Sequence, residues 1–246
     1  MSDLETIIYE KTDAIARITL NRPKFLNAYN IRMRDELYLV LDAIKDDSEV
    51  RVVVLKGAGE KAFCAGADLT EFLTAPSPII ARKVRWERDI WGLFLSLPQP
   101  VIAALHGYVL GSGIEIALCC DLRIASEDAQ FGLPEVRLGI IPAAGATQTL
   151  PRTIGRAKAL EMLLNGRWIS ADEALEARLI NRVVSRDKLL PIVDSIATQI
   201  ASYNQRAIRS AKQALVRGRD LPLAEGLALE KRLAISVQRS LATESL

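Results

Sequence analysis

The 246-residue sequence predicts an α/β core followed by an α-helical C-terminal region. Up to about Gly155, short β-branched apolar runs alternate with longer segments of helical periodicity, the pattern of a sheet whose strands are joined by helices. Beyond Gly155 almost the whole sequence has helical periodicity, with breaks near Gly166, Pro191 and Pro222. Half of the residues are hydrophobic, which is enough for a sizeable buried core.

The N-terminal part contains two predicted strands and one predicted helix. Residues 14–20 (AIARITL) alternate and are rich in β-branched side chains, which favours a strand that ends at the following Asn-Arg-Pro turn. Residues 31–45 place leucine and isoleucine on one face at helical spacing. The run RVVVLKG at 51–57 has the continuous apolar character of a strand buried on both faces of a sheet.

The middle of the chain repeats this alternation. A glycine-rich loop surrounds KAFCAGADL at 61–69, and helical spacing resumes over 79–97 until two prolines end it. The run VIAAL at 101–105 predicts a second strand buried on both faces. In the next segment, GYVLGSGIEIALCCD at 107–121, a glycine turn leads into a helix, and LRIA at 122–125 predicts a further strand.

Composition excludes several classes of protein. Lys and Arg number 32 against 30 Asp and Glu, so a net charge of +2 gives no special attraction to nucleic acid or to anionic membranes. The N-terminus lacks the basic-then-apolar pattern of an export signal, and no window of about 18 apolar residues predicts a membrane span. Cys64, Cys119 and Cys120 have no metal-like spacing and predict no disulfide framework. We therefore expect a cytoplasmic protein with no membrane or nucleic-acid partner.

Glu115 is the first candidate functional residue, because it is a carboxylate inside an apolar helix. The amides of the first helical turn, that of Ser112 among them, have no partner within the helix and can bind an anion. A buried carboxylate must be paired, protonated or placed against a polar cavity, and burial raises its pKa toward the range useful for proton transfer. The alternative is a structural carboxylate held by backbone amides or by Arg123.

Two further stretches carry similar signals. Glu135 follows Glu115 by 20 residues and again lies in apolar company, within FGLPEVRL. Its alternative role is a surface ion pair with Arg137 or Arg152. In KAFCAGADL, the N–H of Ala67 follows a glycine and can point into a cavity, although the loop can equally be an ordinary connection.

Together these three stretches resemble the crotonase superfamily of enoyl-CoA hydratases and isomerases. The match covers nearly the whole chain, from ITLNRPKFLNAYN at 18–30 to LNGRWISADEALEARLINRVV at 164–184. The resemblance implies a crotonase-like spiral of ββα units over residues 1–190 and a helical trimerisation region over 191–246. It also implies a homotrimer or a dimer of trimers. Relatives usually continue beyond SLATESL at 240–246 through one more helix, which is either cut off or absent here.

The resemblance implies an acyl-CoA ligand and no metal or redox cofactor. It assigns the backbone N–H groups of Ala67 and Ser112 to an oxyanion hole for the thioester oxygen. Hydratases use two glutamates, matched here by Glu115 and Glu135, whereas isomerases commonly keep one. We therefore predict an enoyl-CoA hydratase in which Glu115 is the base and Glu135 the proton donor. The alternatives are a double-bond isomerase, a cyclic dienoyl-CoA hydratase, or a catalytically silent relative that binds acyl-CoA or RNA, the last suggested by the basic segment 206–219.

The remaining expected ligand contacts are less specific. Basic side chains are candidates for the CoA phosphates, two tryptophans border the acyl tail in relatives, and one leucine stands where hydratases often carry a polar residue. The set comprises Arg22, Lys24, Lys61, Ala65, Asp68, Leu69, Thr70, Trp86, Trp91 and Leu133. Ser112 replaces the middle glycine of the usual turn, and alanines after Pro142 replace common glycines, which narrows the expected pocket. His106, the one histidine, is expected to be a hydrogen-bonded structural residue.

Overall fold

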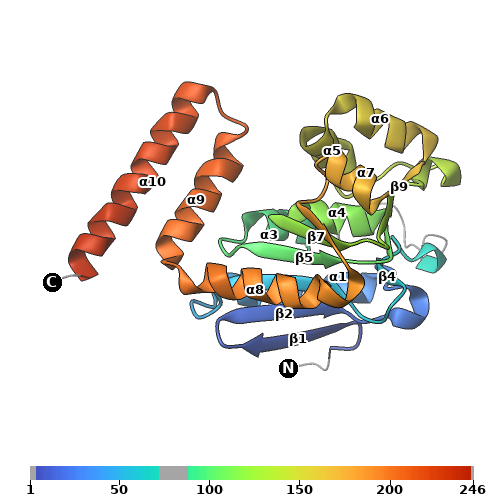
Figure 1. Cartoon of the computed structure of the whole chain (residues 1–246), viewed down its shortest axis with the longest axis horizontal. Helices are drawn as coiled ribbons and strands as arrows, with labels where there is room; N and C mark the ends of the chain where they lie inside the picture. Colours follow the sequence, from blue (N-terminus) through green and yellow to red (C-terminus); the bar gives the residue numbers. More distant parts are fainter. Residues whose placement is uncertain (1–3, 72–87, 245–246) are drawn as a thin grey trace.

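A six-stranded sheet forms the centre of the computed structural model, which describes residues 4–71 and 88–244 (Figure 1). Its strands lie in the order β1-β2-β3-β5-β7-β10. All neighbouring pairs are parallel except β1 and β2, which form an antiparallel hairpin. The strands are β1 (Ile7–Thr12), β2 (Ile15–Leu20), β3 (Val52–Gly57), β5 (Val101–Leu105), β7 (Leu122–Ser126) and β10 (Arg182–Val184).

A second sheet of four short strands has the order β4-β6-β8-β9. It contains β4 (Ala62–Cys64), β6 (Tyr108–Leu110), β8 (Gln130–Gly132) and β9 (Trp168–Ser170). Strands β3, β5 and β7 of the large sheet are each followed along the chain by β4, β6 or β8 of the small one, and then by helical segments. The chain therefore winds through successive ββα units, and the predicted crotonase-like spiral is confirmed.

Helices cover both faces of the large sheet. On one face α1 (Ile31–Asp46), α3 (Ile90–Ser96) and α4 (Ser112–Cys119) share a hydrophobic core with the sheet. On the other face α8 (Leu189–Ser202) packs its alanine and valine side chains against β2, β3, β5 and β7. Burial on both faces explains why β3 and β5 have continuous apolar sequences rather than alternating ones.

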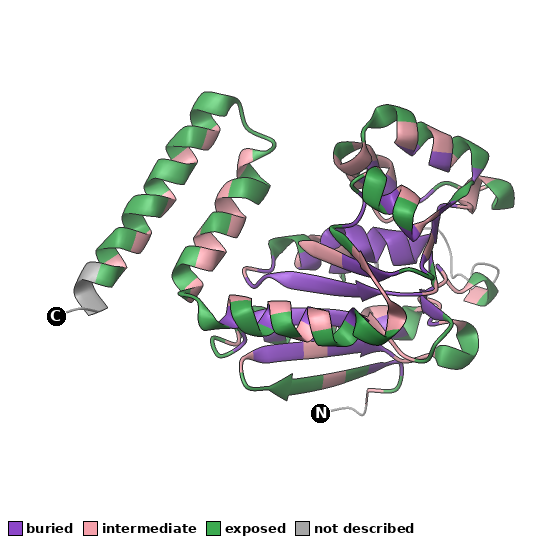
Figure 2. Cartoon of the chain, viewed as in Figure 1, coloured by how far each residue is buried: buried purple, intermediate pink, exposed green. Residues whose placement is uncertain are grey.

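The remaining helices lie toward the C-terminal end of the chain. Helices α5 (Ala146–Ile154), α6 (Arg156–Asn165) and α7 (Ala171–Glu176) lie beyond α4 from the large sheet (Figure 1). Helices α9 (Gln205–Gly218) and α10 (Leu223–Glu244) pack against each other as a hairpin that extends away from the core and is mostly exposed (Figures 1 and 2). Short 3-10 helices cover Pro23–Phe25, Leu69–Glu71, Glu135–Leu138 and Arg186–Lys188. Within the described residues, none of the helices has the length and apolar character needed to cross a membrane.

Several elements of the structure differ from those predicted from the sequence. Strand β1 was not predicted, because all but one of its residues are at least partly exposed and it lacks an apolar run. The region after Gly155 is not wholly helical, because it contains β9 and β10, each too short to show a period. Pro191 does not end a helix but lies in the first turn of α8, where the missing N–H is not needed. Of the helix expected over 79–97, the structure describes α3, which begins only at Ile90 because Asp89 caps its N-terminus, and residues 72–87 lie outside the described part.

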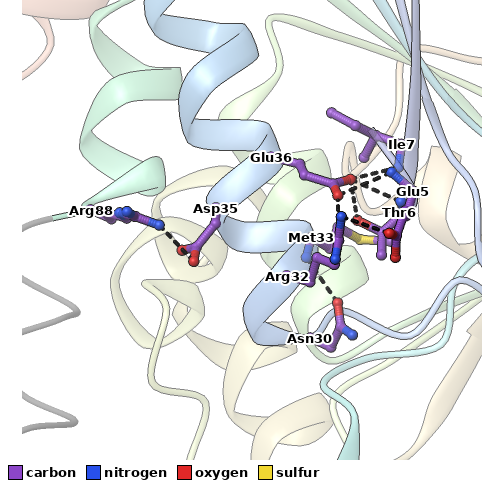
Figure 3. A network of polar contacts seen from close by, with 9 residues as sticks. All are labelled: Glu5, Thr6, Ile7, Asn30, Arg32, Met33, Asp35, Glu36 and Arg88. Atoms are coloured by element: carbon purple, nitrogen blue, oxygen red, sulfur yellow. Dashed lines mark hydrogen bonds and ion pairs between the residues drawn. The ribbon is translucent and has the colours of Figure 1, made fainter. Parts of the chain in front are cut away.

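Glu36 on α1 fastens the chain entering β1 to the core (Figure 3). Its carboxylate accepts hydrogen bonds from the backbone N–H groups of Glu5, Thr6 and Ile7 at 3.0, 2.8 and 3.2 Å. The Thr6 hydroxyl and the Arg32 guanidinium complete the cluster at 2.6 and 2.8 Å. Burial alone would raise the pKa of Glu36, but these hydrogen bonds outweigh it and lower the pKa to about 2.

The Glu36→Ala variant is expected to lose about 3 kcal/mol of unfolding free energy, because it leaves buried N–H groups without acceptors. The contribution of Glu36 is complete above the unfolded-state pKa of 4.5 and is lost as the pH falls toward 2. Urea denaturation at pH 7 and pH 3 measures both effects. The exposed Glu10→Ala variant is the control, and a Glu36→Ala loss no larger than that of this control would contradict the assignment.

Candidate active site

A cavity of about 780 Å³ lies beside the N-terminus of α4. Its walls come from the loop before α1, the glycine loop after β4, the start of α3, the first turn of α4 and the segment between β8 and α5. The lining residues are Tyr29, Arg34, Ala65, Gly66, Ala67, Leu69, Arg88, Trp91, Gly111, Ser112, Glu115, Pro134, Glu135 and residues 138–144. Both predicted glutamates and both predicted amides are therefore brought to one cavity.

The backbone turn before α4 places Ser112 next to the glycine loop. Gly111 has a φ of +49°, which favours glycine, and a Cβ built on it would lie 3.4 Å from the Cα of Gly66. Gly113 allows a similar approach, because a Cβ there would meet the carbonyl oxygen of Cys64 at 2.3 Å. This contact between the two backbones brings Ala67 and Ser112, the residues that follow Gly66 and Gly111, to neighbouring positions on the cavity wall.

The N–H groups of these two residues are available for an outside acceptor. In the parallel bridge between Tyr29 and Ala67, the flanking N–H groups of Tyr29 and Asp68 make the hydrogen bonds, both at 2.8 Å, so the N–H of Ala67 faces the other way. Ser112 is the first residue of α4, so its N–H has no partner inside the helix. Neither N–H donates a hydrogen bond to any described part of the chain.

Glu115 lies in the first turn of α4 and is 3% exposed. Its Oε1 accepts hydrogen bonds from the backbone N–H groups of Ala144 at 2.8 Å and Ala146 at 3.1 Å, where α5 begins. These amides fix the orientation of the carboxylate at the cavity wall. Of the two structural alternatives, the backbone amides do hold Glu115, whereas Arg123 donates instead to the carbonyl oxygens of Leu179 and Ala117 at 2.7 and 3.3 Å, toward the other end of α4.

Glu135 begins the 3-10 helix after β8, and its carboxyl group lies beside the turn at Gly111. A Cβ on Gly111 would lie 2.9 Å from its Oε1, and its Oε2 is buried without a hydrogen-bond partner in the described structure. Burial, and then the negative charge of Glu115, raise the pKa of Glu135 to about 7. Glu135 does not form the alternative surface ion pair with Arg137 or Arg152. Arg137 donates instead to the carbonyl oxygen of Asn165, and Arg152 to that of Gln148.

Removing the acid from Glu135 is expected to stabilise the protein at high pH. Its folded-state pKa of about 7 exceeds the unfolded value of 4.5, so the wild type loses stability as the pH rises between these values. The Glu135→Gln variant lacks this loss and should be more stable at pH 8 by about 1–2 kcal/mol, a value reduced for the partial exposure of the carboxyl. Thermal melts at pH 4 and pH 8 test this, and an equal difference at both pH values would contradict it.

The other expected contacts divide between the cavity and its surroundings. Ala65 and Leu69 line the cavity, as does Trp91, whose ring lies 5.8 Å from that of Tyr29. Leu133 lies in the hydrophobic core and is fully buried, outside the cavity lining. Trp86 lies outside the described residues.

The charged and polar candidates lie on the loop side. Arg22 forms an ion pair with Asp68 at 2.9 Å and donates to the carbonyl of Ala28, so it holds the glycine loop against the turn after β2. The Thr70 hydroxyl donates to the same aspartate at 2.7 Å. Lys24 and Lys61 are exposed to solvent. CoA contacts by these residues stay a prediction.

Sequence reasoning missed several residues that line the cavity. Arg34 and Arg88 come from segments far apart in the sequence and belong to no motif, whereas Tyr29 lies within ITLNRPKFLNAYN but was given no role there. Backbone amides were considered as partners of Glu115, but the sequence did not place them at Ala144 and Ala146, which lie 29 and 31 residues further along the chain. Arg34 could have been placed on one face of its helix, because the helical period separates the apolar positions of this segment from the charged ones.

The histidine and the three cysteines have structural surroundings outside the cavity. His106 Nε2 lies 3.1 Å from the carbonyl oxygen of Gly59, and burial lowers its pKa to about 4, so the prediction of a hydrogen-bonded structural histidine is confirmed. Cys64, Cys119 and Cys120 are buried, and burial raises the pKa of each thiol. In the described ranges, no group of three or more His, Cys, Asp or Glu side chains is placed to hold a metal ion.

The fold defines a protein of the crotonase superfamily. The crystal structure of enoyl-CoA hydratase from Bacillus anthracis matches 96% of this chain and 92% of its own, with a TM-score of 0.91 and 42% identity. The model of the enoyl-CoA hydratase/isomerase family matches residues 10–245, and the chain belongs to this family.

Named relatives act on different acyl groups. The short-chain-enoyl-CoA hydratase of Clostridium acetobutylicum is 42% identical over 229 residues, which cover 93% of this chain and 87% of the relative. The (E)-benzylidenesuccinyl-CoA hydratase of Thauera aromatica is 40% identical over 223 residues, which cover 90% and 86%. The two relatives are almost equally similar to this chain, although their names give different substrates. Sequence similarity therefore does not identify the acyl group, which has to be inferred from the cavity.

Proposed function

We propose that this protein is an enoyl-CoA hydratase that adds water across the 2,3-double bond of an enoyl-CoA thioester. One observation carries the proposal: two carboxyl groups, and two backbone N–H groups that donate to nothing in the described part of the chain, line a single cavity. The hydratases among the relatives support the same reaction class.

The two amides act on the thioester oxygen. Attack of water at C3 moves the π electrons toward the carbonyl, so negative charge develops on that oxygen as an enolate. The N–H groups of Ala67 and Ser112 donate to it, and the positive end of the α4 dipole lies at the same place. Because the donors are fixed by the fold before substrate binds, they need no reorganisation as the charge forms.

The two carboxyl groups move the protons. Glu115, held by two amides, removes a proton from water as the C3–O bond forms. Glu135, with a pKa near 7, gives its proton to C2 as the enolate collapses and the carbonyl re-forms. The pair therefore carries one proton before and after the reaction, and its titration is shared. Hydration involves no net change in oxidation state, so the proposed reaction uses no cofactor.

Hydration is distinguished from double-bond isomerisation by the fate of solvent oxygen. Crotonyl-CoA is incubated with the protein in H₂¹⁸O, the loss of conjugated thioester absorbance is followed, and the product is analysed by mass spectrometry. The proposal expects ¹⁸O on C3 of a 3-hydroxyacyl-CoA. A shifted double bond without ¹⁸O, or no reaction with any enoyl-CoA tested, would overturn it.

We also propose that the protein assembles as a homotrimer or a dimer of trimers. Support comes from the α9–α10 hairpin, which packs on itself and leaves Leu215 and Leu223 75% and 78% exposed. Apolar surface of this kind on a protruding element is typical of a subunit interface.

A further inference from the structure

Two arginines stand out in the wall of the cavity because the surface around them is mostly apolar. Arg34 comes from the first turn of α1, and Arg88 lies two residues before α3. Neither is required by the hydration steps above. A charge buried in an apolar cavity is costly to desolvate, so the mostly buried Arg34 in particular calls for a partner of opposite charge.

Asp35 satisfies part of this requirement. Its Oδ1 accepts from Arg34 Nε at 2.8 Å and lies 2.7 Å from Arg34 Nη2, while its Oδ2 lies 2.6 Å from Arg88 Nη1. Figure 3 shows Asp35 and Arg88 pointing toward one another between α1 and the start of α3. Two guanidinium groups thus share one carboxylate, and the cluster keeps a net charge of +1.

Each guanidinium also keeps donors that Asp35 does not use. Arg34 presents its Nε and Nη2 to Asp35, and Arg88 presents its Nη1. No further side-chain partner of either group occurs within residues 4–71 and 88–244. The planar donor edges that remain match the geometry of a carboxylate.

We infer that Arg34 and Arg88 select enoyl-CoA thioesters whose acyl chain ends in a second carboxylate. This inference rests on the proposed function, because it places the alkene at the two glutamates and the far end of the acyl chain at the arginines. A hydrocarbon tail in the same position would remove water from the guanidinium donors and return no hydrogen bond. A terminal carboxylate replaces that water with charge-assisted hydrogen bonds.

The cluster fits an acyl carboxylate better than a CoA phosphate. The Arg34 side chain is 16% exposed and lies mostly inside the protein, whereas that of Arg88 is 46% exposed and keeps contact with solvent. The phosphates of CoA carry several charges and favour open solvent, so the buried donors of Arg34 suit an acyl carboxylate better. A net charge of +1 balances a single carboxylate. The rings of Tyr29 and Trp91, which pack together, line the same cavity and supply apolar surface for the acyl chain.

The test compares trans-2-enoyl-CoA substrates of five, six and seven acyl carbons, each prepared with a terminal methyl or a terminal carboxylate. Rates of hydration give kcat/KM, and the ratio of the carboxylate to the methyl substrate is taken at each length. We expect this ratio to exceed 10 for at least one length in the wild type. A ratio near or below 1 at every length would overturn the inference while leaving the hydratase proposal intact.

Variants then assign the preference to the cluster. Arg34→Met and Arg88→Met are each expected to lower the ratio at least tenfold, whereas Arg182→Met, which removes an exposed arginine on β10, leaves it unchanged. Asp35→Asn removes the internal competitor and should raise the ratio about threefold, an effect that misfolding cannot imitate. If the arginine variants instead raise KM equally for both substrates, the arginines bind the CoA part and the inference is wrong. Failure of the wild type to hydrate any of these substrates would count against the proposed function and this inference together.

Discussion

Replacing Glu115 or Glu135 with glutamine is expected to lower kcat for the hydration of crotonyl-CoA by about 10²–10⁴-fold, the usual contribution of a positioned acid or base. Glutamine keeps the size of the side chain but cannot take a proton from water or give one to C2. The two effects have different local origins. Glu115 is fixed by the amides of Ala144 and Ala146. Glu135 has a buried oxygen that finds no hydrogen-bond partner among the described residues, and its pKa is raised to about 7.

The two variants should not combine multiplicatively, because the carboxyls share one proton and act in the same transition state. The double variant is expected to lose little more than the more damaged single variant. Glu127→Gln, at an exposed glutamate, is the matched control and should retain full activity. Turnover within threefold of wild type for either Glu115→Gln or Glu135→Gln, with melting curves unchanged at pH 5, would contradict the assigned roles.

Removing the N–H of Ser112 is expected to lower kcat by about 10²–10³-fold, the loss measured when one oxyanion-hole donor is deleted. The Ser112→Pro variant does this with little effect on the helix, because Ser112 is the first residue of α4 and proline is tolerated there. The effect should fall on kcat more than on KM, since the hydrogen bond strengthens as the enolate forms.

The side chain at the same position provides the control. Ser112→Ala and Ser112→Gly keep the backbone N–H and are expected to stay within about threefold of wild-type kcat, because the hydroxyl has no assigned role in catalysis. A thermal melt of Ser112→Pro separates lost chemistry from lost folding. The oxyanion role would be wrong if a well-folded Ser112→Pro protein kept wild-type kcat, or if Ser112→Gly lost as much activity as Ser112→Pro.

The sequence predicts the parts of this fold that bury apolar residues most completely. Strands β3 and β5 and helix α1 were predicted because their burial produces a continuous apolar run or a clear helical period. Strand β1 is largely exposed, and the strands of the small sheet have three residues each, so neither pattern develops in them. Their pairing depends on contacts between distant segments, which a local pattern does not record.

The candidate site follows the same division. Glu115 and Glu135 were predicted because a carboxylate among apolar neighbours is conspicuous in the sequence. Arg34 and Arg88 were not predicted to lie together. They are distant in the sequence, and Asp35 links them only because α1 and α3 pack against each other. The N–H groups of Ala67 and Ser112 were predicted from a glycine turn and a helix start, whereas the donors to Glu115 at Ala144 and Ala146 come from a distant segment and were not located.

The most direct test of the central claim is a crystal structure with acetoacetyl-CoA, whose oxidised C3 prevents hydration. The arrangement proposed here predicts that the thioester oxygen lies about 2.7–3.1 Å from both the Ala67 and Ser112 nitrogens, with C2 and C3 between the carboxyls of Glu115 and Glu135. A thioester oxygen bound elsewhere, or carboxyls on walls that do not both face C2 and C3, would contradict it.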